Sequence, residues 1–374
     1  MNKVKFSKPN ILPDDINLVK KIIKSGWLTH GKYTNLFEKK FNVYTNSKYA
    51  ITVSSCTAAL HLSCLASGFK KGDEIIVPSM SHTATAHAVE YTGAKVVFSE
   101  IDKLTGNITL DHIKKKISKK TKGIIIVHMA GFPCEVDKIS KFCKKNKIIL
   151  IEDCAHALGT FIKRKHAGNY GISGCFSFYP TKQITTGEGG ILITNDLHFF
   201  QKVKKLKAFG IDKDIKDRKK PGDYDVKALG YNYRMTDIQA ALANSQIKRL
   251  SKIVKRRHEI ADIYNKELKN LPVKLPWQDP KTYTSFHLYV IRLKLNEIDI
   301  SHEEFFTKMR KAEILVNLHY IPVYFHPYYR RLGFKKGYCE EAEKYYSDAV
   351  SIPMFPSLKD EDQMKVIKTI KSII

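Results

Sequence analysis

The sequence predicts an α/β fold in which a mostly parallel sheet is covered by helices on both faces. Between Ala50 and Glu152, short runs rich in isoleucine and valine alternate with helical segments. The runs are almost continuously apolar, which is typical of strands buried on both faces, and their alternation with helices is typical of parallel sheets. With 374 residues, the chain is long enough for a second domain, which we expect to be a smaller C-terminal α+β domain.

The N-terminal region precedes the alternating pattern. Leu12–Asp15 (LPDD) carries a proline and two acids, which favour a helix start, and the helix is expected over Ile16–Lys24. The segment Gly26–Phe37 has glycines and polar residues without a clear period and is expected to be a loop. Trp27 in this segment fits a surface connection and a lid over a sugar equally well.

The alternating region accounts for most of the first domain. Each expected strand ends near a polar or turn residue, and ligands of such sheets collect beyond the carboxyl ends of the strands. The expected strands are Ala50–Ser54, Glu74–Pro78, Lys95–Ser99, Gly123–Val127, Ile148–Glu152 and Ile191–Thr194. The expected helices are Thr57–Ala66, His82–Tyr91, Leu110–Lys116, Val136–Asn146 and His198–Ala208.

A charged segment and a long helix lead into the second domain. Gly210–Tyr231 is irregular and is expected to be a mobile loop, whereas Met235–Lys255 reads as a helix, capped by Thr236 or Asp237, that continues towards Tyr264. We place the domain boundary within this helix, giving domains of residues 1–249 and 250–374. Further elements are expected at Phe286–Leu293, Glu303–Ala312 and Asp360–Ile373.

The net charge of +27 is the unusual bulk property. It could indicate a polyanionic partner, but lysine far outnumbers arginine and the basic residues are dispersed along the chain. Sequence-specific nucleic-acid contacts depend on the fork of arginine and on clustering over one face. We therefore expect a solvated lysine-rich surface and no nucleic-acid partner, with a positive field that attracts an anionic substrate.

Membrane insertion and disulfide bonding are not expected. No apolar run approaches the roughly 18–20 residues that span a bilayer, and the N-terminal stretch lacks the apolar core of a signal peptide. The seven cysteines include no CxxC pair, and most lie in apolar segments. They are expected to be reduced thiols of a cytoplasmic protein.

The stretch Ile148–Gly190 holds the candidate cofactor site. Asp153 follows a core strand, and Lys182 lies in a loop before the glycine-rich Thr185–Gly190. A lysine that forms a Schiff base and an acid that keeps a ring nitrogen protonated are the two requirements of a pyridoxal phosphate (PLP) site. On these residues alone, a solvated amine is the commoner role for a lysine such as Lys182, and Asp153 could equally be a cap of the following turn.

Other residues of the same rim could complete the site. The turn Ser54–Thr57 leads into a helix, whose free amides could hold a phosphate, and Ser177 could add a hydroxyl. His82 could stack on a bound heteroaromatic ring, and His156 could contact the ring hydroxyl. The commoner roles of such residues are helix capping and packing in the core.

Metal and dinucleotide sites are not expected. His82 and His87 have the wrong spacing for one helix face, and the segment around His302 lacks the second histidine of a zinc helix. His319 and His326 have no evident third ligand, and there is no phosphate-binding loop of the Walker type. We expect no metal ion.

The motifs together resemble the DegT/DnrJ/StrS-type PLP-dependent sugar-nucleotide aminotransferases, which have fold type I architecture with a sheet of the seven-stranded type. The resemblance covers about Gly26 to Gln363 and rests on motifs in order. They are SGWLTHG (Ser25–Gly31), SSCTAALHL (Ser54–Leu62), VPSMSHTATAHAV (Val77–Val89), EDCAHALG (Glu152–Gly159), FSFYPTKQITTGEGG (Phe176–Gly190), GYNYRMTDIQAAL (Gly230–Leu242) and HYIPVYFHPYY (His319–Tyr329).

The resemblance implies a role for each matching residue. Lys182 is the Schiff-base lysine and Asp153 the partner of the ring nitrogen, while His156 neighbours the ring hydroxyl. His82 takes the stacking position, which is more often Phe or Trp. The implied phosphate ligands are Cys56, Thr57, Ser177 and, from the other subunit of a homodimer, Asn232. The implied sugar-nucleotide contacts are Trp27, Leu28, Thr29, His319 and Tyr320.

The resemblance also implies a ping-pong transamination. Glutamate would convert PLP to pyridoxamine phosphate, which would then aminate a nucleotide-linked 4-keto-6-deoxy sugar for a surface glycan. The segment His319–Arg330 favours a UDP-linked substrate, with dTDP- or GDP-linked sugars as alternatives. Some relatives carry histidine in place of Lys182 and remove a hydroxyl instead. A PLP-fold regulator that binds nucleic acid is the remaining alternative, which the intact set of cofactor residues disfavours.

Overall fold

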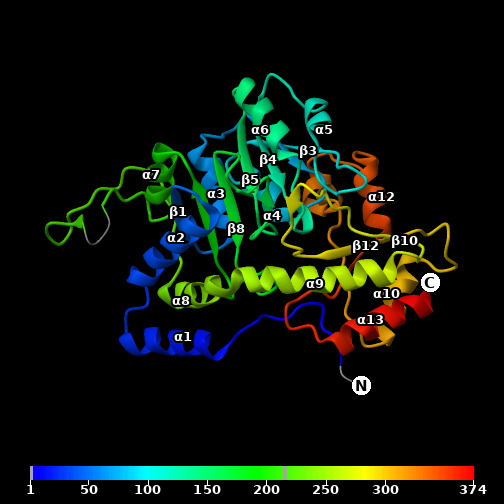
Figure 1. The fold of residues 1–374 in the computed structure, drawn as a ribbon. Coiled ribbons are helices and arrows are strands. Elements are labelled where there is room, and N and C mark those ends of the chain that lie inside the picture. The colour runs from blue at the N-terminus through cyan, green and yellow to red at the C-terminus, as the bar shows by residue number, and fades with distance from the viewer. Residues whose placement is uncertain (1–2, 214–216) are drawn as a thin grey trace.

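The computed structural model describes residues 3–213 and 217–374 and confirms the predicted α/β class. Its centre is a seven-stranded sheet with the order β1-β9-β8-β5-β4-β2-β3 (Figure 1). β9 runs antiparallel to both of its neighbours, β1 and β8, and the other neighbouring pairs are parallel, so the sheet is mostly parallel as predicted. The strands are β1 (Tyr49–Val53), β2 (Glu74–Pro78), β3 (Lys95–Ser99), β4 (Thr121–Val127), β5 (Ile149–Asp153), β8 (Ser173–Ser177) and β9 (Gly190–Thr194).

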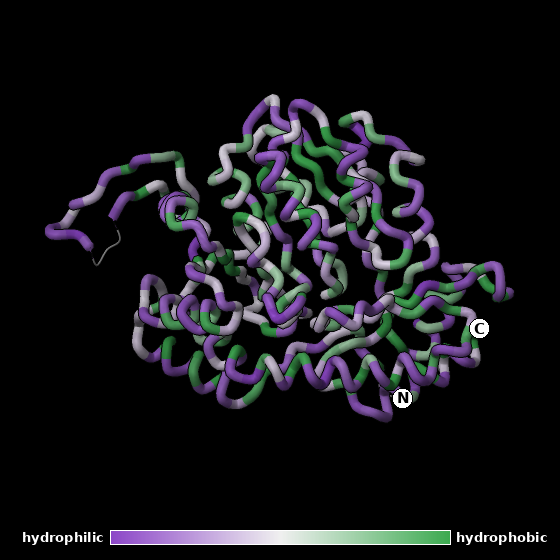
Figure 2. The backbone as a smooth tube through the Cα atoms, turned by 45° about the horizontal axis from the view of Figure 1, so that its top comes forward, coloured by the Kyte–Doolittle hydropathy of each residue, from purple (hydrophilic) through white to green (hydrophobic). Residues whose placement is uncertain are grey.

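The apolar strands bury side chains on both faces of this sheet. In β4, Ile124 and Ile126 belong to one hydrophobic core while Ile125 belongs to the other, and all three are fully buried. Successive strand residues point to opposite faces, so an uninterrupted apolar run requires cover on each side. Figure 2 shows this hydrophobic interior and a mostly hydrophilic periphery.

Helices supply that cover. Residues of α3, α4 and α7 join the core that contains Ile125, and residues of α2, α5, α6 and α8 join the core that contains Ile124 and Ile126. Helix α1 packs against α8. The bounds are α1 (Pro13–Ser25), α2 (Lys32–Thr45), α3 (Cys56–Ala66), α4 (Thr83–Glu90), α5 (Leu110–Lys114), α6 (Val136–Lys145), α7 (Leu197–Leu206) and α8 (Asp237–Gln246).

The last third of the chain builds a small antiparallel sheet with its own helices, beside the end of α9 away from α8 (Figure 1). Its strands are β10 (Val273–Lys274), β12 (Tyr289–Leu293) and β13 (Ala349–Ile352), and its helices are α9 (Leu250–Leu268), α10 (His302–Lys311), α11 (Pro327–Arg331), α12 (Glu340–Asp348) and α13 (Asp360–Ile373). A third sheet joins β6 (Phe161–Ile162) to β7 (Lys165–His166) and β11 (Thr282–Tyr283).

The expected loop over Gly26–Phe37 is wrong in its second half. Helix α2 begins at Lys32, and Gly31 is its N-cap residue. Phe37 and Phe41 lie one turn apart on this helix and are fully buried against the sheet. Burial of this apolar face stabilises the helix. In the sequence, the polar residues between the aromatic ones hid the helical spacing of the apolar residues.

The expected long helix is interrupted near the proposed domain boundary. Helix α8 ends at Gln246, a 3₁₀ turn covers Ile247–Arg249, and α9 begins at Leu250. The division into residues 1–249 and 250–374 stays a prediction. The expected loop Gly210–Tyr231 extends away from the body (Figure 1), and its residues 214–216 lie outside the described residues.

Two expectations about composition can be compared with the structure. All seven cysteines are buried and unpaired. Among the described residues, no helix is long and apolar enough to cross a membrane.

Candidate active site

Asp153 is a buried acid at the carboxyl end of β5. Its Oδ2 accepts a hydrogen bond from Thr85 Oγ1 at 2.8 Å, and its Oδ1 accepts one from the backbone N–H of Ala155 at 3.0 Å. Burial raises the pKa of Asp153, although these hydrogen bonds and the charge of Lys182 oppose the rise. Asp153 therefore caps the turn, but within the described part of the chain its carboxylate forms no salt bridge with a base.

Lys182 lies in the loop between β8 and β9, in the electrostatic range of Asp153. Its backbone N–H donates to Tyr179 O at 2.9 Å, and its Nζ lies 3.3 Å from Nε2 of His287. Burial lowers the pKa of the amine to about 8, which makes the neutral, nucleophilic form accessible near neutral pH. Lys182 is thus not the freely solvated amine of the alternative interpretation.

Two histidines and a tyrosine gather beside this pair. Tyr320 Oη lies 3.1 Å from His156 Nε2, and the rings stack at 6.0 Å. The His82 ring meets Tyr320 edge-on at 6.1 Å, and its Nδ1 accepts the N–H of Ala84, so His82 also caps α4. Burial, reinforced by the charge of Lys182, holds the pKa of His156 well below its usual range, so this histidine is neutral.

The predicted phosphate turn lies at the start of α3. Cys56 and Thr57 are its first residues, so their N–H groups have no partner within the helix. Gly190 packs on this turn so closely that a Cβ there would lie 2.5 Å from the carbonyl carbon of Ser55. Ser177 pairs with Gly190 across the β8–β9 ladder, which places its hydroxyl beside the same turn.

Asn232 and the Trp27 segment lie at the surface of this chain. The exposed Asn232 accepts a hydrogen bond from Nε of Arg234 at 3.0 Å. Trp27 and Leu28 are 61% and 41% exposed, and Thr29 is exposed as well. Their roles in binding phosphate and sugar nucleotide stay predictions.

His319 lies at the edge of the cluster. Its Nδ1 is 2.8 Å from Ser351 Oγ, and its ring stacks on Phe6 at 5.5 Å. Burial, with the nearby charges of Lys182 and His82, lowers the pKa of His319 to about 3. His319 is therefore neutral, and it lies close enough to Lys182 for the two side chains to interact electrostatically.

Three residues of the cluster are absent from our sequence predictions: Thr85, Gln183 and His287. Thr85 lies in the first turn of α4, shortly after the capping residue His82. Its side chain faces the sheet, and the helical periodicity of the sequence could have predicted this orientation. Gln183 Nε2 donates to His156 O at 3.1 Å and to Ser285 Oγ at 3.0 Å. No local pattern marks Gln183 or His287.

The comparison with protein families agrees with this arrangement. Residues 9–371 match the DegT/DnrJ/EryC1/StrS aminotransferase family, which is nearly the whole chain. The chain belongs to this family.

Individual relatives of the family cover almost all of this chain. GDP-perosamine synthase of Vibrio cholerae is 32% identical over 98% of this chain and 97% of its own. PseC of Helicobacter pylori, an aminotransferase involved in the biosynthesis of pseudoaminic acid, is 30% identical with a TM-score of 0.93 over 100% of this chain and 99% of its own. Spr1654 of Streptococcus pneumoniae in its PMP form is 29% identical with a TM-score of 0.93, over 99% and 98%. The predicted fold type I architecture is confirmed by these similarities.

The site fits PLP, the cofactor implied by this aminotransferase family. The buried Asp153 forms no salt bridge with any described residue, and a protonated ring nitrogen would supply such a partner. The free amides of Cys56 and Thr57 suit a phosphate, and Lys182 is an amine with a lowered pKa.

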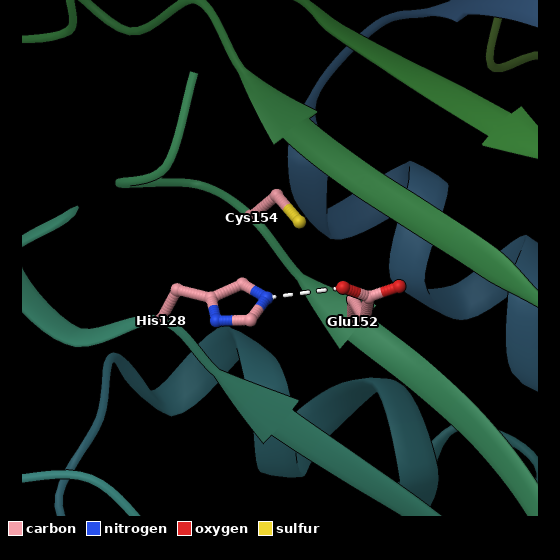
Figure 3. Close-up of side chains that lie close together, drawn as sticks. All are labelled: His128, Glu152 and Cys154. Carbon is pink, nitrogen blue, oxygen red and sulfur yellow. Dashed lines mark hydrogen bonds and ion pairs between the residues drawn. The ribbon is translucent and has the colours of Figure 1, made fainter. Parts of the chain in front are cut away.

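A separate buried group, His128, Glu152 and Cys154, has the proximity of metal ligands (Figure 3). Glu152 Oε2 lies 3.1 Å from His128 Nε2, and its carboxylate also accepts the N–H groups of Gly168, Tyr170 and Gly171. Burial raises the pKa of the Cys154 thiol well above its usual range, so the thiolate that a metal prefers is disfavoured. The geometry suits a structural network that holds the turn before β8.

Glu152→Gln tests this structural role. Burial alone would raise the pKa of Glu152, but His128 and the N–H donors hold it below its usual value. The charged form therefore stabilises the fold above the unfolded pKa of about 4.3, and this stabilisation is lost as the pH falls. We expect the variant to lose about 3 kcal/mol in free energy of unfolding at pH 7, and less at pH 4.

Urea unfolding at both pH values measures this difference. Glu297→Gln is the matched control, because Glu297 makes an exposed pair with Lys294, and it should change stability by less than about 1 kcal/mol. Equal effects of the two substitutions would contradict the structural role of Glu152.

Proposed function

We propose that the chain is a PLP-dependent aminotransferase that moves an amino group from glutamate to a nucleotide-linked 4-keto-6-deoxy sugar. The observation that carries this proposal is the juxtaposition of an unpaired buried acid, Asp153, with Lys182, whose pKa is lowered to about 8. A lysine with a purely structural role needs neither a buried acid beside it nor a lowered pKa. Aminosugar products of this kind enter surface glycans.

The proposed cofactor contacts are those that the family resemblance assigns to these residues. PLP, when bound, withdraws electrons from the amino carbon of the substrate. Asp153 would keep its ring nitrogen protonated, His82 would lie against the ring, and His156 would contact the ring hydroxyl. Lys182 would hold the cofactor through its amine and, as a free amine, would move the proton of the substrate α-carbon.

The phosphate site requires a second subunit. Cys56 and Thr57 donate backbone N–H groups, Ser177 donates its hydroxyl, and Asn232 of a partner subunit completes the set. The exposed apolar side chains Val226 and Leu229, 65% and 88% exposed, support an additional protein surface next to Asn232. The protein is therefore a homodimer with shared active sites.

The substrate side is formed by an exposed segment and a half-buried one. Trp27, Leu28 and Thr29 close over the sugar nucleotide, and His319 with Tyr320 faces the sugar. We favour a UDP-linked sugar. The similarity to GDP-perosamine synthase supports a GDP-linked sugar as the alternative, and a dTDP-linked sugar is the third candidate.

A panel of keto-sugars carried by UDP, GDP and dTDP, each incubated with glutamate and PLP, tests the proposal. We expect mass spectrometry to show an aminated nucleotide sugar and 2-oxoglutarate, with the fastest turnover for a UDP-linked sugar. Fastest turnover with GDP or dTDP would replace the nucleotide assignment alone. No aminated product from any sugar, together with sequence-selective DNA binding at physiological salt, would favour the regulator alternative.

A further inference from the structure

We propose that His287 is a positioning residue that holds the Lys182 amine by accepting its N–H at Nε2. The inference rests on the proposed function only in taking Lys182 as the reacting amine. It concerns the free amine of Lys182, before it is joined to any cofactor. In that state a flexible side chain of four methylene groups needs a fixed partner to stay aligned.

The contact is direct and lies in a protected place. Lys182 Nζ is 3.3 Å from His287 Nε2, and His287 is only 3% exposed. The ring packs on His156 with centroids 4.4 Å apart and the planes 35° from parallel. A ring held in this way has little freedom to leave the lysine.

The charge state of His287 suits an acceptor. Burial, together with the charge of Lys182, holds the pKa of His287 well below its usual range, so the imidazole is neutral. A charged lysine has donors only, so Nε2 must accept and the ring proton must lie on Nδ1. His287 Nδ1 has no hydrogen-bond partner among the described residues, which is consistent with a ring oriented for the lysine.

A buried arginine fixes the backbone that carries His287. Arg257 in α9 is 1% exposed, and its Nη1 donates to Phe286 O at 3.0 Å, His287 O at 3.1 Å and Met354 O at 3.1 Å. These partners are carbonyl dipoles, and burial lowers the pKa of Arg257 to about 10. Phe286 has a φ of +43°, an unfavourable value for a bulky residue, which such a clamp can maintain.

Residues next to Lys182 and near His287 form further hydrogen bonds between the loops that carry these two side chains. Gln183, next to Lys182, donates to Ser285 Oγ at 3.0 Å, and Ser285 donates to His156 O at 2.7 Å. The Lys182 loop, the His287 loop and the His156 turn thus form one hydrogen-bonded unit. The position of His287 relative to Lys182 is set by these contacts rather than by the lysine itself.

Other titratable groups interact electrostatically with Lys182 or His287 and must be kept in any test. Cys56 and Asp153 favour the charged form of Lys182, and Arg257 opposes it. His156, His319 and Arg257 act on His287 from the neighbouring elements. A substitution confined to His287 leaves all of these groups in place.

The test uses the full chain without cofactor or sugar, so that its result does not depend on the proposed aminotransfer. Competitive acetylation over a range of pH, read at the Lys182 peptide by mass spectrometry with the exposed Lys144 as internal reference, gives the titration midpoint of the amine. We expect a midpoint near 8 in the wild type. His287→Phe removes the acceptor, so the midpoint should fall by about one pH unit, a roughly tenfold change in proton affinity.

Two further variants separate the contact from general effects. His287→Gln places an amide oxygen near the position of Nε2 and should restore the midpoint. His302→Phe removes a histidine whose Nε2 lies 2.9 Å from a backbone carbonyl, that of Ala349, and should leave the midpoint unchanged. An unchanged or raised midpoint in folded His287→Phe would overturn the proposal, as would an equal shift in His302→Phe.

A measurement on the wild type covers the case in which His287→Phe does not fold. Nitrogen-15 spectra of the histidine rings, assigned with His287→Gln, should show His287 neutral at pH 7 with its proton on Nδ1. A proton on Nε2 would overturn the proposal.

Discussion

Replacing Lys182 with alanine is expected to lower kcat about ten-thousandfold, the upper end of the effect of a positioned acid–base group. The variant has no amine to carry the cofactor and none to move the α-proton. Stopped-flow absorbance with glutamate, followed by mass spectrometry of the nucleotide sugar, measures both half-reactions. A small external amine should restore part of the rate, because the chemical group and not the fold is missing.

Lys141→Ala is the control for charge and lysine content. Lys141 is exposed on α6, and its removal should leave kcat within about twofold of the wild type, since surface changes away from the site have small effects. Retention of keto-sugar amination by purified Lys182→Ala would refute the assignment of the catalytic lysine.

Asp153→Asn is expected to lower kcat about a thousandfold, as removal of a preorganised electrostatic contact does. The amide has nearly the same shape and can keep the contact with Thr85, but it cannot hold the ring nitrogen protonated. Cofactor should still bind through Lys182 and the phosphate turn, so the loss should appear in kcat more than in cofactor affinity. Near wild-type turnover would contradict the assigned role.

The same substitution should stabilise the chain without cofactor. Burial raises the pKa of Asp153, so folding favours its protonated form, and the stability linked to that proton is lost as the pH rises through the folded pKa. At pH 7 the neutral amide avoids the cost of the buried charge, and urea unfolding should show a higher free energy of unfolding. Asp111→Asn, at a side chain that is 85% exposed, should change it by less than about 0.5 kcal/mol. A destabilised Asp153→Asn would show that Thr85 and Ala155 fully compensate the charge.

Much of the fold could be predicted because its signals are local. The strands Glu74–Pro78 and Lys95–Ser99 match the structure residue for residue, since apolar runs of that length between turn residues have few other solutions. Thr236 caps α8 through the N–H of Gln239, as one of the two predicted caps. The rim position of Asp153 also followed, because parallel strands end on one edge of the sheet.

The local signal failed where elements depend on distant contacts. Helix α2 is fixed by Phe37 and Phe41 against the sheet, and the break before α9 separates two helices whose sequences continue without a clear stop. From the sequence alone, Asp153 could be either a cap of the following turn or the partner of a cofactor. Only the described hydrogen bonds show that it caps the turn and remains a buried acid without a base.

The sequence by itself determined the α/β class, the parallel sheet and the rim on which Asp153 and the Cys56 turn lie, because burial on both faces dictates an apolar strand pattern. The tertiary structure decided which residues surround Lys182. His287 follows it by about a hundred positions and reaches it through a loop clamped by Arg257. Such a contact depends on packing between segments that are far apart in the chain, and the periodicity of a sequence cannot predict it.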